Sequence, residues 1–323
     1  MHSQPRPDQK PGTITDRADP APGDQEIVAA LDLGSNTIKM TLGRLDDTGH
    51  LVEFGWASDT VRLGTGVAAT GRLADDRVAA ALETLKRFAD AAREQGAARL
   101  VGVATEATRT AANGPNFLAQ IRDEIGWDIQ PITGSEEAEL TFRGLSRSID
   151  TTGQIVIADI GGGSTEIIVA KHGVVAFSQS YPVGSGSLTD RHVTADPPTA
   201  AEIAACRDDA AGILAPAEMP AGPVSRLVAV GGTGTYLAKL IDDQTAITTG
   251  EVIHVLKQLT AIPAAELAVK LAIPEARARV LPAGIAVIEV VATRLHEPLI
   301  EVAPSGIRTG LLLRALQPLS AHP

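Results

Sequence analysis

The sequence contains almost no cysteine, and this limits the kinds of protein that it can encode. Cys206 is the single cysteine among 323 residues, which excludes an internal disulfide framework. Such scarcity is typical of proteins from a reducing compartment, so we expect a cytoplasmic location. Cys206 lies in an alanine-rich stretch with no adjacent histidine, which predicts a packing role rather than a catalytic thiol.

The sequence also lacks long apolar runs and an excess of basic residues. No apolar stretch approaches the ~20 residues of a membrane-spanning helix. Residues 1–25 are rich in Pro, Asp, Gln and Gly and contain no hydrophobic region, which predicts a disordered tail rather than a secretion signal. The net charge of −11 argues against broad nucleic-acid binding. Binding of a phosphate-rich ligand must therefore depend on a local basic cluster, backbone amides or a metal ion.

What the chain does contain is the composition of an α/β protein, with 44% apolar and 3% aromatic residues. Its apolar periodicity predicts strands at 27–33 and 38–45, and the same strand pair resumes near 155. We therefore predict two lobes of the same architecture, 26–148 and 149–323, with a terminal helix at about 306–316 that can pack back on the first lobe. The pattern further predicts a helix over 136–147 capped by Ser135, and two separate helices at 273–280 and 284–295.

An apolar strand runs twice into an aspartate and a glycine-rich turn, and an apolar strand then resumes. The first copy contains Asp32, Gly34, Ser35, Asn36 and Thr37; the second contains Asp159, Gly161, Gly162, Gly163, Ser164, Thr165 and Glu166. Glycines let backbone N–H groups approach an anion, and the neighbouring aspartate suits the hard divalent cation that accompanies phosphate. Two such tips that face each other can hold a phosphate chain from both ends.

These two motifs resemble the phosphate motifs of the superfamily that contains actin, sugar kinases and heat-shock chaperone ATPases. Two further segments, Ala104-Thr-Glu-Ala-Thr-Arg109 and Thr133-Gly-Ser-Glu136-Glu137-Ala-Glu-Leu140, resemble the exopolyphosphatase and guanosine pentaphosphate phosphohydrolase (Ppx/GppA) family. The resemblance covers about residues 26–314. It implies an α/β fold of two ribonuclease-H-like, actin-like ATPase lobes with the active site in the cleft between them.

The resemblance also implies roles for individual residues. Glu137 would be the general base that activates water, with the adjacent Glu136 as the alternative, and Arg109 would contact the phosphate chain. Asp32, Asp159 and Glu166 would hold Mg²⁺, or Mn²⁺ in its place, directly or through water. The residues that would bind phosphate are Gly34, Ser35, Asn36, Thr37, Gly161, Gly162, Gly163, Ser164, Thr165, Gly184, Gly232 and Arg308.

One departure from the family pattern stands near the end of the chain. The family usually carries Arg-Glu-Gly where this sequence reads Arg308-Thr309-Gly310, so a glutamate is missing. No Gly-x-x-x-x-Gly-Lys-[Ser/Thr] is present, which excludes a P-loop enzyme. The histidines show no metal-ligand spacing.

The function implied by the resemblance is hydrolysis of terminal phosphoanhydride bonds of inorganic polyphosphate, with short chains favoured by the acidic net charge. Guanosine pentaphosphate shares the terminal phosphoanhydride and is the close alternative substrate. Two further functions are compatible with the motifs: an ATP-dependent kinase or ATPase of the same superfamily, and a non-catalytic regulator that binds (p)ppGpp or polyphosphate. The high apolar content is compatible with a homodimer.

Overall fold

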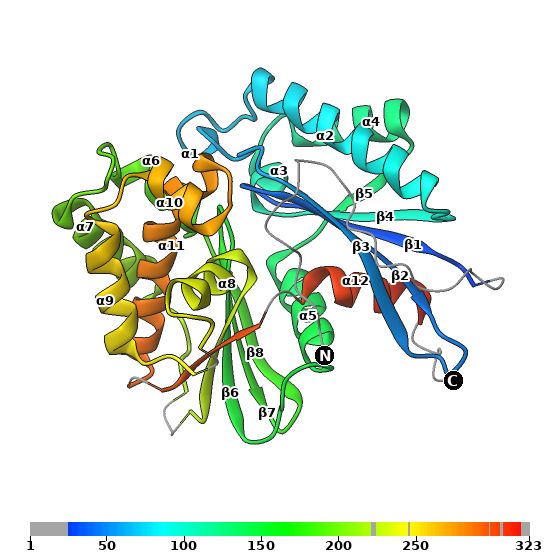
Figure 1. The fold of residues 1–323 in the computed structure, drawn as a ribbon. Helices are drawn as coiled ribbons and strands as arrows, with labels where there is room; N and C mark the ends of the chain where they lie inside the picture. Colours follow the sequence, from blue (N-terminus) through cyan, green and yellow to red (C-terminus); the bar gives the residue numbers. More distant parts are fainter. Residues whose placement is uncertain (1–24, 221–223, 245, 297, 304–305, 318–323) are drawn as a thin grey trace.

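The chain folds into two α/β lobes, each built on a five-stranded sheet (Figure 1). The computed structural model describes residues 25–220, 224–244, 246–296, 298–303 and 306–317, so the predicted tail lies outside them apart from Gln25. The first sheet has the strand order β3-β2-β1-β4-β5 and the second β8-β7-β6-β9-β10. The strands are β1 (Val28–Leu33), β2 (Ile38–Leu45), β3 (Leu51–Asp59), β4 (Arg99–Ala104), β5 (Asp128–Pro131), β6 (Gln154–Ile160), β7 (Thr165–Lys171), β8 (Val174–Tyr181), β9 (Arg226–Val230) and β10 (Ile300–Ala303).

The two sheets have the same topology. In each, an antiparallel hairpin extends to a third strand, and two parallel strands complete the opposite side. The predicted repeat of architecture is therefore confirmed. Because β1 and β6 are the central strands, the hairpin tips β1–β2 and β6–β7 lie at equivalent places in the two lobes.

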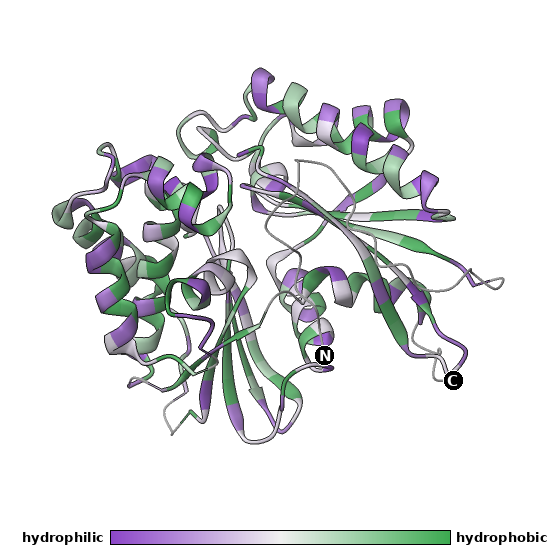
Figure 2. Ribbon diagram, viewed as in Figure 1, coloured by the Kyte–Doolittle hydropathy of each residue, from purple (hydrophilic) through white to green (hydrophobic). Residues whose placement is uncertain are grey.

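Helices cover both faces of each sheet (Figure 2). They are α1 (Val67–Thr70), α2 (Asp75–Glu94), α3 (Glu106–Thr110), α4 (Gly114–Ile125), α5 (Gly134–Leu145), α6 (Ser185–His192), α7 (Ala200–Leu214), α8 (Gly231–Leu240), α9 (Thr249–Leu259), α10 (Ala264–Leu271), α11 (Glu275–Arg294) and α12 (Ile307–Leu316). Helices α2 and α4 bury one face of the first sheet, and α6 to α11 bury one face of the second. No helix in these described ranges is long and apolar enough to cross a membrane.

Helices α5 and α12 pack against each other between the two sheets. Phe142 and Leu145 of α5 bury against the second sheet, whereas Leu311 and Leu312 of α12 bury against the first. Glycines bring the two backbones together: a Cβ added at Gly310 would lie 2.0 Å from the carbonyl oxygen of Leu140, and one at Gly144 1.9 Å from that of Gly306. A larger residue at either position would push the helices apart.

Two local predictions need correction. The cap of α5 is Thr133 rather than Ser135, because the Thr133 hydroxyl accepts the N–H of Glu136. The predicted break at Pro282 is absent, and α11 runs through it as one helix. The helix is buried along most of its length, so packing outweighs the single hydrogen bond that proline removes. Gly231 and Gly232, directly after β9, form the first turn of α8.

Candidate active site

The tip of the β1–β2 hairpin presents buried polar groups that have no partner within the described chain. The backbone is braced by the N–H groups of Arg62 and Gly64, which donate to the carbonyl oxygens of Asn36 and Ser35 at 2.8 and 2.7 Å. By contrast, both amide atoms of the Asn36 side chain and the Thr37 hydroxyl are buried and accept or donate no hydrogen bond. Buried polar atoms are rarely left in this state, so this tip is prepared for a ligand.

The tip of the β6–β7 hairpin presents backbone N–H groups instead. The carbonyl oxygens of Gly161 and Gly162 accept hydrogen bonds from the first residues of α6, Ser185 and Gly186, at 2.9 and 2.8 Å. Among the described residues, the N–H groups of Gly162, Gly163 and Ser164 donate no backbone hydrogen bond. With the carbonyls held away by α6, these amides form a concave surface suited to an anion.

Two of the predicted phosphate-binding residues serve this tip structurally. A Cβ at Gly184 would lie 2.8 Å from the carbonyl oxygen of Gly161, so glycine permits the close approach of α6. Thr165 is fully buried and its hydroxyl donates to the carbonyl oxygen of Val183 at 2.6 Å. The Thr165 hydroxyl is therefore not placed to touch phosphate, and the N–H of Gly184 already donates to the Ser187 hydroxyl at 2.9 Å.

The two tips meet across the cleft between the lobes. A Cβ at Gly162 would lie 2.8 Å from the backbone nitrogen of Asn36, and one at Gly163 would lie 2.7 Å from the hydroxyl oxygen of Ser35. Glycine is therefore required at both positions for the lobes to come this close. The predicted arrangement of two facing tips is present in the structure.

Glu137 and Glu136 have different surroundings although they are adjacent. The Glu136 carboxylate accepts hydrogen bonds from the N–H and the hydroxyl of Thr133, both at 2.8 Å, and closes a capping box. Glu137 is only 8% exposed, and its Oε2 has no hydrogen-bond partner in the described structure. Glu136 thus takes part in the capping box at the start of α5, whereas Glu137 lies in the cleft.

Glu137 stands in a group of acidic side chains. Burial, and then the charges of Glu166, Asp32 and Asp159, raise the pKa of Glu137 well above its usual value. Arg109 partly offsets this, with Nη1 at 3.7 Å from Oε2. A carboxylate with a raised pKa and a free oxygen is suited to accept a proton from water near neutral pH.

The three carboxylates predicted to bind metal are close to one another but are not equivalent. Burial raises the pKa values of Asp32 and Asp159, and burial together with Asp159 raises the pKa of Glu166 to about 8. Asp159 accepts a hydrogen bond from Thr141 at 3.2 Å, and Glu166 accepts one from Ser180 at 2.6 Å.

Within the described ranges, no three Asp, Glu, His or Cys side chains are grouped as a ready-made metal site. That Asp32, Asp159 and Glu166 hold Mg²⁺, directly or through water, stays a prediction. The donor chemistry nevertheless fits Mg²⁺. This ion commonly binds to one or two carboxylates and completes its shell with phosphate oxygens and water. Asp32 and Asp159, one from each lobe, supply such a pair.

Cationic side chains complete the cleft, and two of them were missed by sequence reasoning. Lys39 pairs with Asp32 across the β1–β2 hairpin, and burial followed by the charge of Arg308 lowers the pKa of Lys39 to about 8. Arg277 is 8% exposed, lies over the Tyr236 ring and influences Lys39 electrostatically. The alternation of β2 places Lys39 on the same side as Asp32 and could have revealed it, whereas nothing local marks Arg277.

Gly232 and Arg308 take up places around these cations. A Cβ at Gly232 would lie 1.9 Å from Nη2 of Arg277, so glycine makes room for that guanidinium. Arg308 donates from Nε to the Thr41 hydroxyl at 2.8 Å, and its Nη1 is buried without a partner in the described structure. At the position of the missing family glutamate, the Thr309 hydroxyl donates to Glu53 at 2.6 Å. Glu53 also acts electrostatically on Arg308, so β3 supplies a carboxylate near this arginine.

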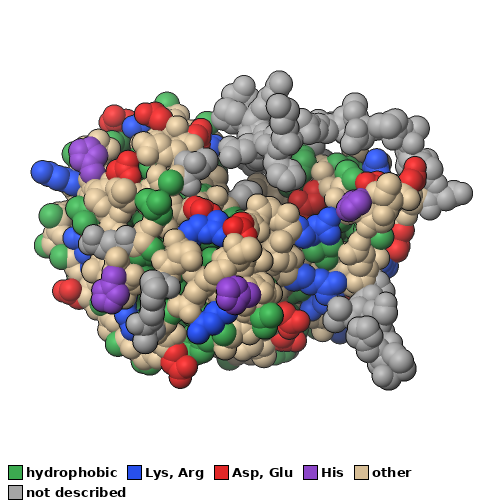
Figure 3. All heavy atoms as spheres, turned by 90° about the horizontal axis from the view of Figure 1, so that it is seen from below, with side chains coloured by type: hydrophobic (Ala, Val, Ile, Leu, Met, Phe, Trp, Pro, Cys, Tyr) green, Lys and Arg blue, Asp and Glu red, His purple; other side chains and the backbone are tan. Residues whose placement is uncertain are grey.

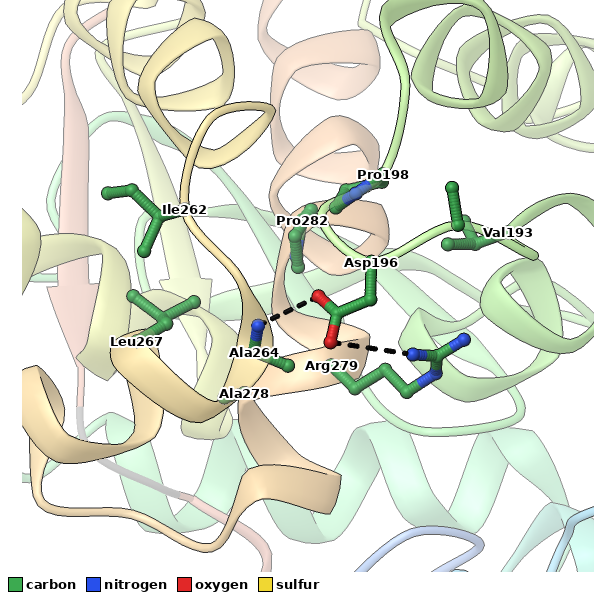
Figure 4. A pocket seen from close by; sticks show the side chains of 10 residues that line it. Val193, Asp196, Pro198, Ile262, Ala264, Leu267, Ala278, Arg279 and Pro282 are labelled. Atoms are coloured by element: carbon green, nitrogen blue, oxygen red, sulfur yellow. Dashed lines mark hydrogen bonds and ion pairs between the residues drawn. The ribbon is translucent and has the colours of Figure 1, made fainter.

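A cavity of about 410 Å³ continues from the two tips between the lobes. Ser35, Asn36, Gly162 and Gly163 line it on one side. The rest is lined by residues of α1, α3 and α6, by the segments that flank α1, and by Pro182 and Ile213. This volume is typical of small-molecule sites. A second pocket, next to Asp196, measures only about 10 Å³ (Figure 4). There Asp196 accepts the N–H of Ala264 and pairs with Arg279, which leaves room for little more than one water molecule.

Comparisons with known proteins show the family and the fold of this chain. The model of the Ppx/GppA phosphatase family matches residues 47–319. The chain belongs to this family. Exopolyphosphatase 2 of Mycobacterium tuberculosis is 33% identical over 291 residues, which cover 84% of this chain and 91% of that protein. The resemblance read from the sequence is thereby confirmed.

Solved structures of Ppx/GppA proteins confirm the predicted fold class. The structure of the Aquifex aeolicus family member has a TM-score of 0.73 at 28% identity and covers 90% of this chain and 97% of its own. An exopolyphosphatase structure from Cytophaga hutchinsonii has a TM-score of 0.83 at 24% identity, with 91% and 99% covered, and bears on the fold alone. The two-lobed, actin-like arrangement is common to these proteins.

Proposed function

We propose that this Ppx/GppA protein is an exopolyphosphatase that releases orthophosphate from the end of inorganic polyphosphate. The observation that carries the proposal is the convergence of unpartnered polar groups on one point. Among the described residues, buried side-chain atoms without hydrogen-bond partners occur in seven residues, and four of these (Asn36, Thr37, Glu137 and Arg308) line the interlobe cleft. Curated relatives named exopolyphosphatase at 30–33% identity support the same activity.

In the proposed reaction, the terminal phosphoryl group lies between the two hairpin tips. The amides of Gly162, Gly163 and Ser164 and the side chains of Asn36 and Thr37 hold its oxygens. Glu137 orients water for in-line attack and takes its proton. Arg109, Lys39 and Arg308 balance the negative charge, because such transfer depends on positioning and electrostatics.

We also propose Mg²⁺ as the metal, held by Asp32 and Asp159 together with substrate oxygens. Proteins of this family generally depend on a divalent metal. When bound, the ion would offset charge on the bridging and terminal oxygens of the bond that breaks. Burial raises the pKa values of both aspartates although the charges of Lys39 and Arg308 partly offset it, so a bound divalent cation would favour their charged forms further.

Guanosine pentaphosphate is a second candidate substrate, because part of the cavity wall is apolar. Val67, Ala68 and Ile213 contribute to this wall and could receive a nucleoside. Polyphosphate remains the first proposal. The net charge of −11 favours short chains over long ones. On the face shown in Figure 3, which is seen from below and away from α1, α3 and α6, Lys and Arg side chains are interspersed with Asp and Glu.

The test is orthophosphate release in the presence of Mg²⁺ from tripolyphosphate, long polyphosphate, guanosine pentaphosphate and ATP, with Glu137→Gln in parallel. Release from polyphosphate that is lost in the variant supports the proposal. Release only from ATP, with ADP as the second product, would identify an ATPase. Tight binding without turnover would identify a regulator instead.

The cytoplasmic location, which rests on cysteine usage, and the homodimer remain predictions. Light scattering of the purified protein measures the oligomeric state directly.

A further inference from the structure

The cavity beyond the hairpin tips is crossed by an ion pair between the lobes. Arg62, from the segment after β3, and Asp190, from α6, both line the cavity and approach to 2.5 Å. Among the described residues, this is the only ion pair that links residues 26–148 to residues 149–317. The pair therefore lies where a phosphate chain leaving the two tips would have to pass.

The position of Arg62 is coupled directly to the phosphate tip. Its backbone has a φ of 54°, in the left-handed region that non-glycine residues seldom adopt. Its N–H donates to the carbonyl oxygen of Asn36 at 2.8 Å, which holds this conformation in place. The guanidinium is therefore held close to the hairpin tip that would bind the terminal phosphate. A residue that binds the next phosphates of the chain needs such a fixed position.

The charges along the cavity wall are balanced in the structure. Arg191, the other arginine of the wall, pairs with Asp209 at 2.7 Å, and Glu106 pairs with Arg109. The side chains of Arg62 and Asp190 are 18% and 33% exposed. An ion pair with this exposure is weak, whereas a phosphate group bound by a guanidinium through two hydrogen bonds is favoured strongly.

We propose that this cavity is the subsite for the phosphates behind the one that is cleaved, and that Arg62 is its chain-length-selecting residue because it exchanges Asp190 for a distal phosphate. This inference rests on the proposed polyphosphatase function. Asp190 then competes with the substrate for Arg62. A chain long enough to reach Arg62 binds more tightly because it pairs with this cation, and a shorter chain obtains less binding energy from it.

Substitution of Arg62 and substitution of Asp190 should change KM for polyphosphate in opposite directions. Arg62→Gln removes the cation, so KM should rise about fivefold for a chain of some fifteen phosphates and by a smaller factor for tripolyphosphate. Asp190→Asn removes the competitor, so KM for the longer chain should fall about two- to threefold. That fall should vanish in the double variant, because no cation remains to be released.

The experiment is steady-state orthophosphate release with Mg²⁺ from both chain lengths by wild type, the two single variants and the double variant. Arg122→Gln on α4 is the matched control, since Arg122 is largely exposed and remote from the cavity lining. If Arg62→Gln fails to fold, Arg62→Lys and Asp190→Asn still test the direction in which KM changes.

Chain-length-dependent KM changes of opposite sign support the subsite. Equal changes for both chain lengths, or a rise in KM with Asp190→Asn, would show that the pair merely fastens the lobes and would overturn it. If the wild type releases no orthophosphate from either chain, the proposed function fails as well, and that result differs from both of the others.

Discussion

Replacing Glu137 with glutamine should separate catalysis from binding and from stability. The side chain keeps its size and its place in the cleft but loses the ability to accept a proton from water. Removal of a positioned general base lowers kcat by ~100- to 10,000-fold, or about 3 to 5 kcal/mol in activation free energy. KM should stay the same or fall, because one of the carboxylates that repel the substrate loses its charge.

The same substitution should stabilise the metal-free protein at neutral pH. The pKa of Glu137 in the folded state lies well above its unfolded value of about 4.5, owing to burial and three neighbouring carboxylates. The folded protein therefore binds more protons at Glu137, so the contribution of this group to stability is fully present below pH 4.5 and is lost as the pH rises through the folded pKa. Each unit by which folding raises this pKa costs the wild type about 1.4 kcal/mol of unfolding free energy at high pH. The glutamine variant, which has no such proton to release, does not bear this cost.

The assay combines orthophosphate release from tripolyphosphate with thermal unfolding from pH 5 to 8. Glu136→Gln is the matched control, because it removes a charge one residue away and weakens the capping box of α5. It should lower Tm and largely retain kcat. A Glu137→Gln enzyme with wild-type kcat, or a Glu136→Gln enzyme that loses as much, would refute the assignment of the base.

Three further outcomes are expected. Gly310→Ala should unfold the protein or lower its stability by more than ~3 kcal/mol, since the new Cβ would lie 2.0 Å from the Leu140 carbonyl oxygen. Gly212→Ala is the control: its Cβ would have nothing within 4 Å, so chemical denaturation should show a slight gain in stability. Because the pKa of Lys39 is lowered to about 8, KM for polyphosphate should rise as the pH increases through 8, and Lys39→Arg should keep KM low at pH 9; a wild-type KM that stays level to pH 9 would contradict this. Chelation of divalent metal should abolish orthophosphate release, and Asp32→Asn should raise the Mg²⁺ concentration at half-maximal rate; an unchanged Mg²⁺ titration would exclude Asp32 as a ligand.

Much of the site could be predicted because its main parts are local in sequence. The hairpin tips at Asp32 and Asp159 are continuous segments whose alternating strands and glycine turns are legible in the residues themselves. The duplication of this pattern predicted two lobes, and the structure has two sheets of the same topology. Local chemistry also placed Glu137 near the start of a helix, although the cap proved to be Thr133.

The remaining parts depend on contacts between distant segments, which no local pattern specifies. Arg277 reaches the cleft only because Gly232 leaves space for it, and Arg62 meets Asp190 only because folding places the two lobes side by side. Likewise, the glutamate missing at Thr309 is matched by Glu53 from another strand. The sequence by itself determined the two glycine-rich hairpin tips, since a turn's conformation depends on its own few residues. Only the tertiary structure decided which charges surround them, because burial and electrostatic fields arise from side chains that folding brings together.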